Sequence, residues 1–311
     1  MKYVVTGGAG FIGSHIVEEL AARSHEVVIL DDLSTGTKEN IASFPGRENV
    51  TFAEGSITDS PFLKKTFEGA DGVFHEAAIA SVPRSVKNPQ ATHAVNLTGT
   101  FNVFSAARDC GVRKVVFASS AAVYGESPEL PKREDLPPQT LSPYAVAKLA
   151  GEYYGAVFTK LYGVQCTALR YFNVFGPRQD PHSPYSGVIS KFIDQTLAHR
   201  PLTIFGDGTQ TRDFVYVKDV VQANLLAMEG RGSTGGIFNV ALGTKINLLE
   251  LADTIREITG IAVPVTFARA ADGDIKDSLA DITRARDVLG YAPEYTVRAG
   301  LEKTIEWYQS A

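Results

Sequence analysis

The chain has 311 residues and a formal net charge of −5 at pH 7, with the hydrophobic and charged fractions of an ordinary globular protein, so it is long enough for two domains. The acidic balance, without any run of Lys and Arg, argues against a nucleic-acid partner. Cys110 and Cys166 are its only cysteines and no Cys/His cluster has metal-site spacing, which argues against a disulfide framework and a metal site.

The first half of the chain alternates short apolar strands with helices. Residues 2–6 read as a buried strand, too short and glycine-rich for a signal peptide, and no apolar run reaches membrane-spanning length, so we expect a cytoplasmic protein with no membrane partner. An amphipathic helix follows over 11–20, and another covers 91–109. Further strands are predicted at 26–30, 50–53, 72–75, 114–118 and 165–170. This order predicts an α/β fold, a Rossmann-type doubly wound parallel sheet.

The alternation of strands and helices ends after about residue 173, where glycine and proline mark an irregular stretch. Beyond it we expect short strands, a helix near 247–259 and a final amphipathic helix, whose shared face carries Leu301, Thr304, Ile305 and Tyr308. We therefore expect a dinucleotide-binding domain over 1–173, to which 211–247 returns, and a smaller, partly interleaved substrate domain over 174–311.

A glycine-rich turn joins the first strand to the first helix. Gly7 permits the tight turn, Gly10 lets the backbone approach a pyrophosphate, and Gly13 allows close helix–strand packing. Asp31 ends the next strand, where a carboxylate accepts hydrogen bonds from the ribose hydroxyls and repels a 2′-phosphate. The motif predicts NAD rather than NADP; the plainer alternative is that Asp31 only starts a loop.

Tyr144 is followed by a lysine, Lys148, one helical turn later, and of the twelve tyrosines it alone has this spacing. Ser142 and Pro143 predict that a helix begins just before it. A nearby ammonium and the positive end of a helix both favour the phenolate, so we expect the pKa of Tyr144 to be lowered. Together with a nucleotide fold, such a phenol indicates proton removal from a hydroxyl coupled to hydride transfer.

Six motifs follow one another along the chain, at Thr6 to Gly13, Asp31 to Gly36, Ser119 to Gly125, Ser142 to Lys148, Leu169 to Asn173 and Gln210 to Val217. In the order and spacing of these motifs, and over nearly its whole length, the chain resembles the extended short-chain dehydrogenase/reductase family, and within it the UDP-sugar 4-epimerases.

The resemblance implies roles for individual residues. Tyr144 matches the catalytic base, Lys148 its activator and a ligand of the nicotinamide ribose, and Ser120 the hydroxyl that bonds the sugar O4 and relays the proton. The other residues that it assigns to the NAD cofactor are Gly7, Gly10, Phe11, Ile12, Gly13, Asp31, Asp32, Leu33, Ser34, Thr35, Gly36, Ser56, Ile57, Ala77, Ala78, Asn96 and Phe172.

The resemblance also implies a UDP-sugar site. Asn173 and Arg212 match groups that hold the diphosphate, and Thr203 and Phe205 fall where the family holds uracil. The remaining residues assigned to the substrate are Val188, Lys191, Arg269, Asp274 and Ser278.

Two positions depart from the family's pattern, and a third bears on the choice of sugar; a further departure, at the acid and base positions, follows below. Serine at Ser56 replaces a frequent acid that contacts adenine. Three residues before Asp274, many relatives carry a diphosphate-binding arginine; here Ala271 stands there, and either Arg269 reaches in or one contact is missing. Small Ser278 matches a position that lines the sugar's 2-substituent, which predicts tolerance of the N-acetyl sugars.

The type of reaction is indicated by two alanines at positions where some related enzymes carry acidic residues. Related dehydratases carry two acids after the residue that matches Ser120, and decarboxylases usually carry a Glu nearby, whereas this chain has Ala121 and Ala122. We therefore expect a 4-epimerase of UDP-hexoses that returns the hydride to a transient 4-keto sugar. The resemblance also implies a homodimer, formed by the helices over 91–109 and after Ser142.

Two alternatives of other kinds stay open. Another UDP-sugar enzyme of the family, such as a UDP-glucuronate 4-epimerase or a decarboxylase, would need an extra cation for its carboxylate substrate, for which Arg84 and Arg269 are candidates. A non-catalytic NAD-binding protein would have no need of Ser120, Tyr144 and Lys148 together.

Overall fold

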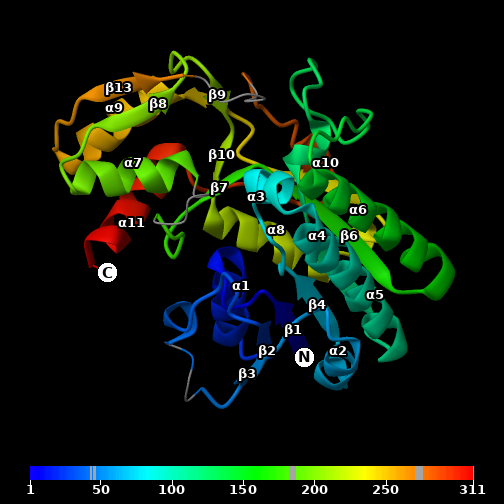
Figure 1. Cartoon of the computed structure of the whole chain (residues 1–311). Helices are drawn as coiled ribbons and strands as arrows, with labels where there is room; N and C mark the ends of the chain where they lie inside the picture. The colour runs from blue at the N-terminus through cyan, green and yellow to red at the C-terminus, as the bar shows by residue number, and fades with distance from the viewer. Residues whose placement is uncertain (43, 45–46, 182–186, 270–275, 311) are drawn as a thin grey trace.

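The computed structural model describes residues 1–42, 44, 47–181, 187–269 and 276–310. Within these ranges a parallel sheet carries helices on both faces, and a smaller lobe of short strands and helices lies beside it (Figure 1). The strands are β1 Lys2–Thr6, β2 Glu26–Asp31, β3 Val50–Glu54, β4 Gly72–His75, β5 Lys114–Ser120, β6 Gln165–Tyr171, β7 Asn173–Phe175, β8 Leu202–Phe205, β9 Thr211–Arg212, β10 Phe214–Tyr216, β11 Ile237–Val240, β12 Ile246–Asn247 and β13 Val265–Ala268. The helices are α1 Phe11–Ala22, η1 Glu39–Ile41, α2 Ser60–Phe67, α3 Val82–Lys87, α4 Pro89–Thr92, η2 His93–Gly99, α5 Thr100–Asp109, η3 Ala121–Tyr124, α6 Pro143–Tyr162, α7 Val188–Leu197, α8 Val217–Glu229, η4 Arg231–Ser233, α9 Leu248–Thr259, α10 Thr283–Leu289 and α11 Val297–Ser310.

The central sheet has the strand order β11-β6-β5-β4-β1-β2-β3, and its neighbouring strands run parallel. The chain proceeds outward from β1 to β3 on one side and from β4 to β6 on the other, so the strand order reverses between β1 and β4. Open parallel sheets bind ligands outside the carboxyl ends of their strands at such a reversal. The predicted Rossmann-type sheet is confirmed, and its topology places the site.

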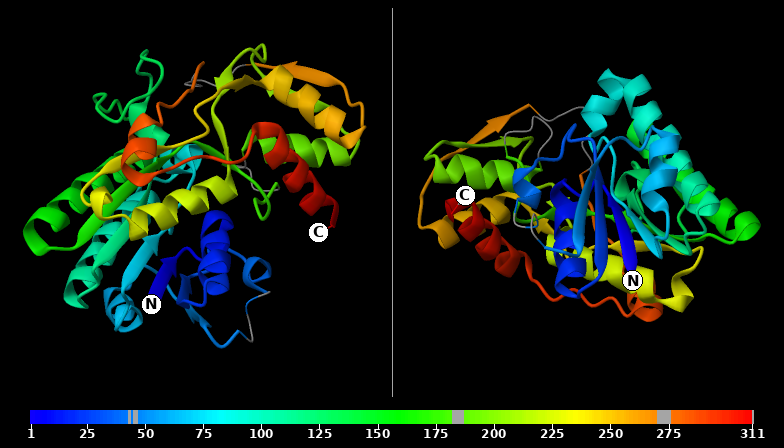
Figure 2. Two further views of the ribbon diagram at one scale, coloured as in Figure 1. Left: turned by 180° about the vertical axis from the view of Figure 1, so that it is seen from behind. Right: turned by 90° about the horizontal axis from the view of Figure 1, so that it is seen from below.

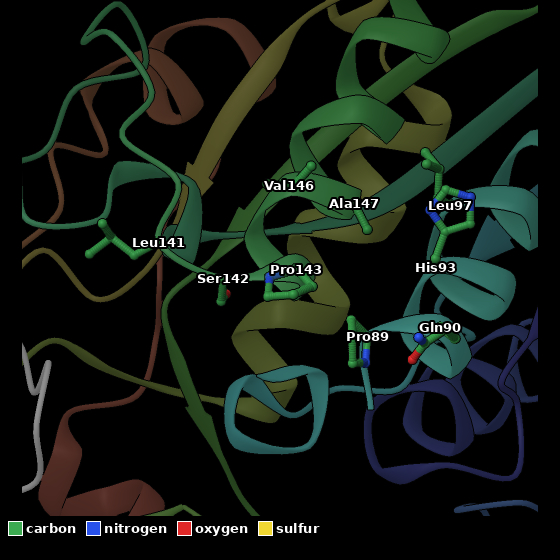
Figure 3. Close-up of a pocket in the computed structure, with 9 residues that line it drawn as sticks. All are labelled: Pro89, Gln90, His93, Leu97, Leu141, Ser142, Pro143, Val146 and Ala147. Atoms are coloured by element: carbon green, nitrogen blue, oxygen red, sulfur yellow. The ribbon is translucent and has the colours of Figure 1, made fainter. Parts of the chain in front are cut away.

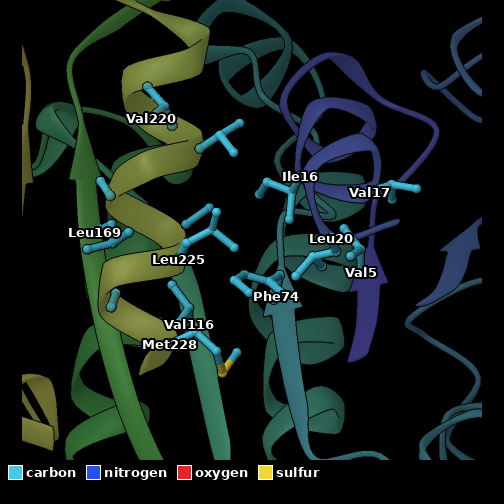
Figure 4. Close-up of a cluster of buried hydrophobic side chains, with 14 of the residues drawn as sticks. Val5, Ile16, Val17, Leu20, Phe74, Val116, Leu169, Val220, Leu225 and Met228 are labelled. Atoms are coloured by element: carbon cyan, nitrogen blue, oxygen red, sulfur yellow. The ribbon is translucent and has the colours of Figure 1, made fainter. Parts of the chain in front are cut away.

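Two apolar cores cover the two faces of this sheet. On one face α1 and α8 pack through side chains such as Ile16 and Leu225 against Phe74 of β4 (Figure 4). On the other face α2, α5 and α6 pack together, with Phe104 and Phe158 among the buried side chains. Views from behind and below show the two helix layers on either side of the strands (Figure 2).

The smaller lobe has its own core, built from α7, α9 and α11 against β8 and β13. Leu301, Thr304 and Ile305 on the predicted face of the last helix are buried, and β8 pairs with β13 in parallel. Strand β11 comes later in the chain than β8 but belongs to the central sheet, as its edge strand beside β6. None of the described helices is long and apolar enough to span a bilayer.

One predicted helix has an irregular middle. Residues 89–109 form α4, η2 and α5 in succession, and η2, His93–Gly99, is a π-helix. Such segments are rare and concentrate at functional sites, because the wider turn redirects side chains.

Candidate active site

The turn between β1 and α1 packs backbone against backbone. Gly7 lies in the left-handed region at φ 68°, and a Cβ on it would lie 2.7 Å from the amide nitrogen of Ala77. A Cβ on Gly13 would lie 2.2 Å from the Gly7 carbonyl oxygen, and one on Gly10 would lie 3.1 Å from it. Phe11 and Ile12 then form the first turn of α1. The start of this helix directs its free N–H groups toward the carboxyl edge of the sheet, where they suit a phosphate.

The end of β2 is tied to the same turn. The carboxylate of Asp31 is buried and accepts hydrogen bonds from the backbone N–H of Ala9 at 3.0 Å and of Leu33 at 2.8 Å. Burial raises the pKa of Asp31, which the two N–H donors oppose. Leu33 has a φ of 56°, a strained conformation of the kind that functional loops retain. The following predicted residues lie around this carboxylate, with Asp32, Ser34 and Thr35 exposed and Gly36 buried against Ala9.

A hydrogen-bonded chain fixes the end of β4. Thr100 Oγ1 donates to the Asn96 carbonyl oxygen, so it accepts from His75 Nε2 at 3.0 Å, and His75 Nδ1 then accepts from Thr6 Oγ1 at 2.8 Å. Burial lowers the pKa of His75 to about 3, in keeping with this neutral ring. The Asn96 side chain binds both the N–H and the C=O of Ile79. Asn96 therefore holds the segment that contains Ala77 and Ala78 in place, from the middle of the π-helix.

Three other residues predicted to touch NAD are placed differently from one another. The Ile57 side chain is buried in the core beside Gly99. Ser56 is half-buried and its hydroxyl accepts from Thr58. Phe172 is buried and packs near Tyr124, with ring centroids 6.2 Å apart.

The catalytic candidates meet at the carboxyl end of β5. Ser142 caps α6 by accepting the N–H of Ala145 at 3.2 Å, which places Tyr144 in the first turn as predicted. Lys148 is buried and its Nζ donates to the Ala118 carbonyl oxygen at 2.6 Å, while lying 5.8 Å from the centre of the Tyr144 ring. Ser120 lies within hydrogen-bond reach of Tyr144. The structure thus brings Ser120, Tyr144 and Lys148 together.

The expectation that the Tyr144 pKa is lowered is wrong when only the protein's own groups act on the phenol. Burial raises the pKa of Tyr144, the hydrogen bond from Ser120 lowers it, and the negative charge of Glu76 raises it again. Lys148 is itself affected, since burial lowers its pKa to about 8. At Tyr144 desolvation outweighs the hydrogen bond from Ser120. A further positive charge is therefore needed to favour the phenolate.

A cavity of about 310 Å³ is lined by residues of β7, α7 and β8. It brings together five of the residues predicted to bind substrate, Asn173, Val188, Thr203, Phe205 and Arg212. Arg212 Nη1 donates to the Thr211 carbonyl oxygen at 2.8 Å, and Asn173 Nδ2 donates to that of Asp213 at 3.2 Å. The half-exposed aromatic ring of Phe205 and an arginine in one pocket suit a nucleotide base and its phosphates.

The other predicted substrate residues lie outside this lining. Lys191 is on α7, one turn after Val188, and Arg269 follows β13 on the surface. The backbone N–H of Ser278 donates to the Thr211 carbonyl oxygen at 3.1 Å, so Ser278 lies beside the strand that carries Arg212. Ala271 and Asp274 fall outside the described residues.

Sequence reasoning missed two residues that support this pocket. Gln210 lines it and donates to the Phe205 carbonyl oxygen at 2.5 Å. The buried carboxylate of Asp213 accepts from the backbone N–H of Leu242, Gly243 and Ala280, which ties three segments together behind Arg212. Both belong to the motif Gln210 to Val217, so a polar residue on either side of Arg212 was the available signal.

Comparisons with known proteins agree with this geometry. Residues 3–241 match the model of the NAD dependent epimerase/dehydratase family. The chain belongs to this family. A UDP-glucose 4-epimerase of Mycolicibacterium smegmatis is 42% identical over 100% of this chain and 99% of its own. A UDP-N-acetylglucosamine 4-epimerase from Methanobrevibacter ruminantium, solved with UDP-N-acetylmuramic acid, superposes with a TM-score of 0.95 at 42% identity, covering 99% of this chain and 98% of that one. A Thermus thermophilus UDP-glucose 4-epimerase, solved with NAD, gives 0.90 at 39% identity, covering 100% of both.

The cofactor of this epimerase/dehydratase family member is NAD, and the residues present fit it. The glycine turn leaves no space for a side chain where a pyrophosphate must approach, and Asp31 stands where the ribose hydroxyls would bind. Asn96 would act on the cofactor through the backbone of 77–79 that it holds.

We expect Gly13→Ala to weaken NAD binding about 10- to 100-fold, because the added methyl group would lie 2.2 Å from the Gly7 carbonyl oxygen and must displace the turn. The measurement is the NAD that copurifies, together with its dissociation constant. Gly232→Ala is the matched control, since its Cβ would make only an ordinary 3.6 Å contact with Val288. Unchanged NAD retention in Gly13→Ala would contradict the assigned role of the turn.

Proposed function

We propose that the chain is a 4-epimerase of UDP-hexoses, which interconverts UDP-glucose with UDP-galactose and UDP-GlcNAc with UDP-GalNAc. The observation that carries the proposal is that Ser120, Tyr144 and Lys148 meet at the carboxyl end of β5, next to the strand that leads into the pocket. Ser120 pairs with Tyr171 across β5 and β6, and Asn173 follows two residues later. A sugar whose diphosphate binds at Asn173 and Arg212 would thereby reach Tyr144.

In the proposed mechanism Tyr144 takes the proton of the sugar O4, directly or through Ser120, while Lys148 contributes positive charge. Bound NAD supplies the chemistry of accepting a hydride from C4 and returning it. Ala121 and Ala122, which follow Ser120 in η3, offer no second acid or base for elimination or decarboxylation. The 4-keto sugar must present its opposite face before the hydride returns, so the pocket's hold on the nucleotide would carry most of the binding energy.

The choice of sugar is part of the proposal. Ser278 is small and its backbone is bonded beside Arg212, which supports room for a 2-acetamido group. The Methanobrevibacter relative, a UDP-N-acetylglucosamine 4-epimerase, is consistent with this reading. We also propose the division into an NAD domain over 1–173 with 211–247 and a UDP-sugar domain over 174–311, and a cytoplasmic location.

The test is to incubate the purified protein, without added cofactor, with UDP-glucose and separately with UDP-GlcNAc, and to follow the sugar C1 proton by NMR. Conversion of both sugars is the expected result. Conversion of only one sugar would support the proposed epimerase activity and contradict the inference about the 2-acetamido group drawn from Ser278. If neither sugar is converted even after NAD is supplied, while UDP-glucuronate is epimerised or decarboxylated, the proposal is wrong in its substrate.

We further propose that two copies pair through α5 and α6. Val146, Tyr153, Val157 and Leu161 lie along one side of α6 with 44–64% of their surface exposed, and Phe101 of α5 adds an exposed ring. A groove of about 740 Å³ opens beside Val146, lined by Pro89, Gln90, His93 and Leu97 of the facing helices (Figure 3). An apolar strip of this extent suits a self-complementary interface.

A charge in that strip should separate the copies. We expect wild-type protein to sediment as a dimer at micromolar concentration and Val157→Asp combined with Leu161→Asp to sediment as a monomer, because each copy would bury two carboxylates against its partner. Phe267→Asp, at an equally exposed position on β13, is the control and should stay dimeric. A wild-type monomer would rule the interface out.

A further inference from the structure

Glu76 is a carboxylate that the proposed mechanism does not use, and it stands where the strand order reverses. It directly follows β4, and its backbone N–H donates to the Thr6 carbonyl oxygen at 3.1 Å, at the end of β1. The backbone of 76–77 is also the surface against which Gly7 packs. Glu76 therefore lies at the sheet edge where parallel sheets of this topology bind their ligands.

The donor and acceptor of each hydrogen bond in the chain from Asn224 through Tyr171 to Glu76 can be assigned. Asn224 Nδ2 on α8 donates to the Tyr171 hydroxyl oxygen at 2.7 Å and to the Val220 carbonyl oxygen at 2.9 Å. The Tyr171 hydroxyl proton is thus available for Glu76 Oε1, which lies 2.9 Å away. Tyr171 and Asn224 are buried, whereas Glu76 is partly exposed. Asn224 thus orients the Tyr171 hydroxyl as a donor toward the carboxylate, and this hydrogen bond favours the ionised form of Glu76.

Glu76 also acts electrostatically on the catalytic groups. The charged and titratable groups that face it are Lys148 and Tyr144 on α6 and Tyr171 on β6, while α8 contributes the uncharged Asn224. Burial raises the pKa of Glu76 to about 7, against the Tyr171 hydrogen bond and the Lys148 charge, which lower it. Glu76 raises the pKa of both Tyr144 and Lys148. The carboxylate is therefore close enough to affect whatever lies between it and Tyr144.

Charge balance indicates what this carboxylate does. The phenolate of Tyr144, the ammonium of Lys148 and the positive ring of oxidised NAD together leave one uncompensated positive charge in a poorly solvated site, which an ionised Glu76 cancels. An ionised carboxylate attracts the positive ring of oxidised NAD and not the neutral ring of reduced NAD, so its charge favours the oxidised form. We propose that the ionised carboxylate of Glu76 makes the site prefer oxidised over reduced NAD, and so returns it to the form that starts each turnover.

The test compares cofactor preference in wild type, Glu76→Gln and Glu76→Asp. Each protein, as purified with its cofactor, is equilibrated with a known mixture of oxidised and reduced NAD, and the bound ratio is read from the absorbance of the reduced nicotinamide. We expect Glu76→Gln to shift the bound ratio toward the reduced form by about tenfold, and Glu76→Asp, which keeps the charge, to stay within about threefold of wild type. A purely structural role for Glu76 would not distinguish the two forms of the cofactor.

Tyr171→Phe provides a second, independent arm. Loss of its hydroxyl donor raises the pKa of Glu76, so the pH at which the bound ratio changes from the Glu76→Gln value to the ionised value should be higher in Tyr171→Phe than in wild type. A Glu76→Gln ratio within about twofold of wild type at alkaline pH, an equal shift in Glu76→Asp, or a transition in Tyr171→Phe at the wild-type pH would overturn the proposal. No sugar is present, so these outcomes do not depend on the proposed substrate.

Discussion

Tyr144→Phe is expected to lower kcat about 10³-fold while NAD stays bound, because the variant keeps the ring and loses only the group that moves the O4 proton. The ring lies 5.8 Å from Lys148 Nζ and within hydrogen-bond reach of Ser120, and the variant leaves both of these neighbours unchanged. The measurement is steady-state epimerisation across pH, with the bound NAD quantified in parallel. Tyr162→Phe, at an exposed position at the end of the same helix, is the control.

The pH dependence gives the same experiment a second readout. Proton removal needs the phenolate, so wild-type activity should rise with pH as Tyr144 ionises. Burial raises the pKa of Tyr144, which moves this rise toward alkaline pH unless the positive cofactor ring opposes it. Tyr144→Phe should lack the rise altogether. Activity within tenfold of wild type, or an unchanged pH profile, would show that another group is the base.

Glu152→Gln is expected to destabilise the folded chain by about 3–5 kcal/mol, because it leaves Arg170 buried without its counter-charge. Glu152 and Arg170 form a buried ion pair at 2.8 Å on two parallel hydrogen bonds, and Glu152 also accepts from Ser119 Oγ at 2.5 Å. Glu152 follows Lys148 by one helical turn, so the pair fixes how α6 sits on β5 and β6. The measurement is the free energy of unfolding in denaturant.

Two comparisons isolate this ion pair. Glu152→Leu combined with Arg170→Met removes both charges and should cost less than the sum of the two single changes. Arg298→Ala breaks an exposed pair with Glu257 and should change stability by less than about 1 kcal/mol. A loss below about 1 kcal/mol in Glu152→Gln would mean that Arg170 finds other partners and that the pair does not hold α6.

The parallel sheet could be predicted because its strands are buried on both faces and read as continuous apolar runs, as in Glu26–Asp31. Tyr144 and Lys148 were equally readable, since their spacing is local and Ser142 caps their helix. The π-helical turn around Asn96 was not, because its apolar pattern is that of an ordinary helix and only the bonds to Ile79 reveal its purpose.

The features that could not be predicted depend on contacts between segments that are far apart in the sequence. The pairing of β8 with β13, and of Ser278 with Thr211, joins segments more than sixty residues apart, so no local pattern announces them. The direction of the Tyr144 pKa was misjudged because it depends on burial and on Glu76, neither of which the spacing of Tyr144 and Lys148 contains. Glu76 was visible in the sequence as a charge after an apolar strand, but its bond to Tyr171 was not.

The central claim is that the hydride taken from C4 returns to the same carbon. The most direct test is to convert UDP-glucose that carries deuterium at C4, in ordinary water, and to measure the deuterium at C4 of the epimer by NMR and mass spectrometry. The account predicts that the product retains the label at C4, because the hydride stays in the site while the keto sugar rotates to present its other face. Epimer formed with loss of the deuterium to water would contradict it.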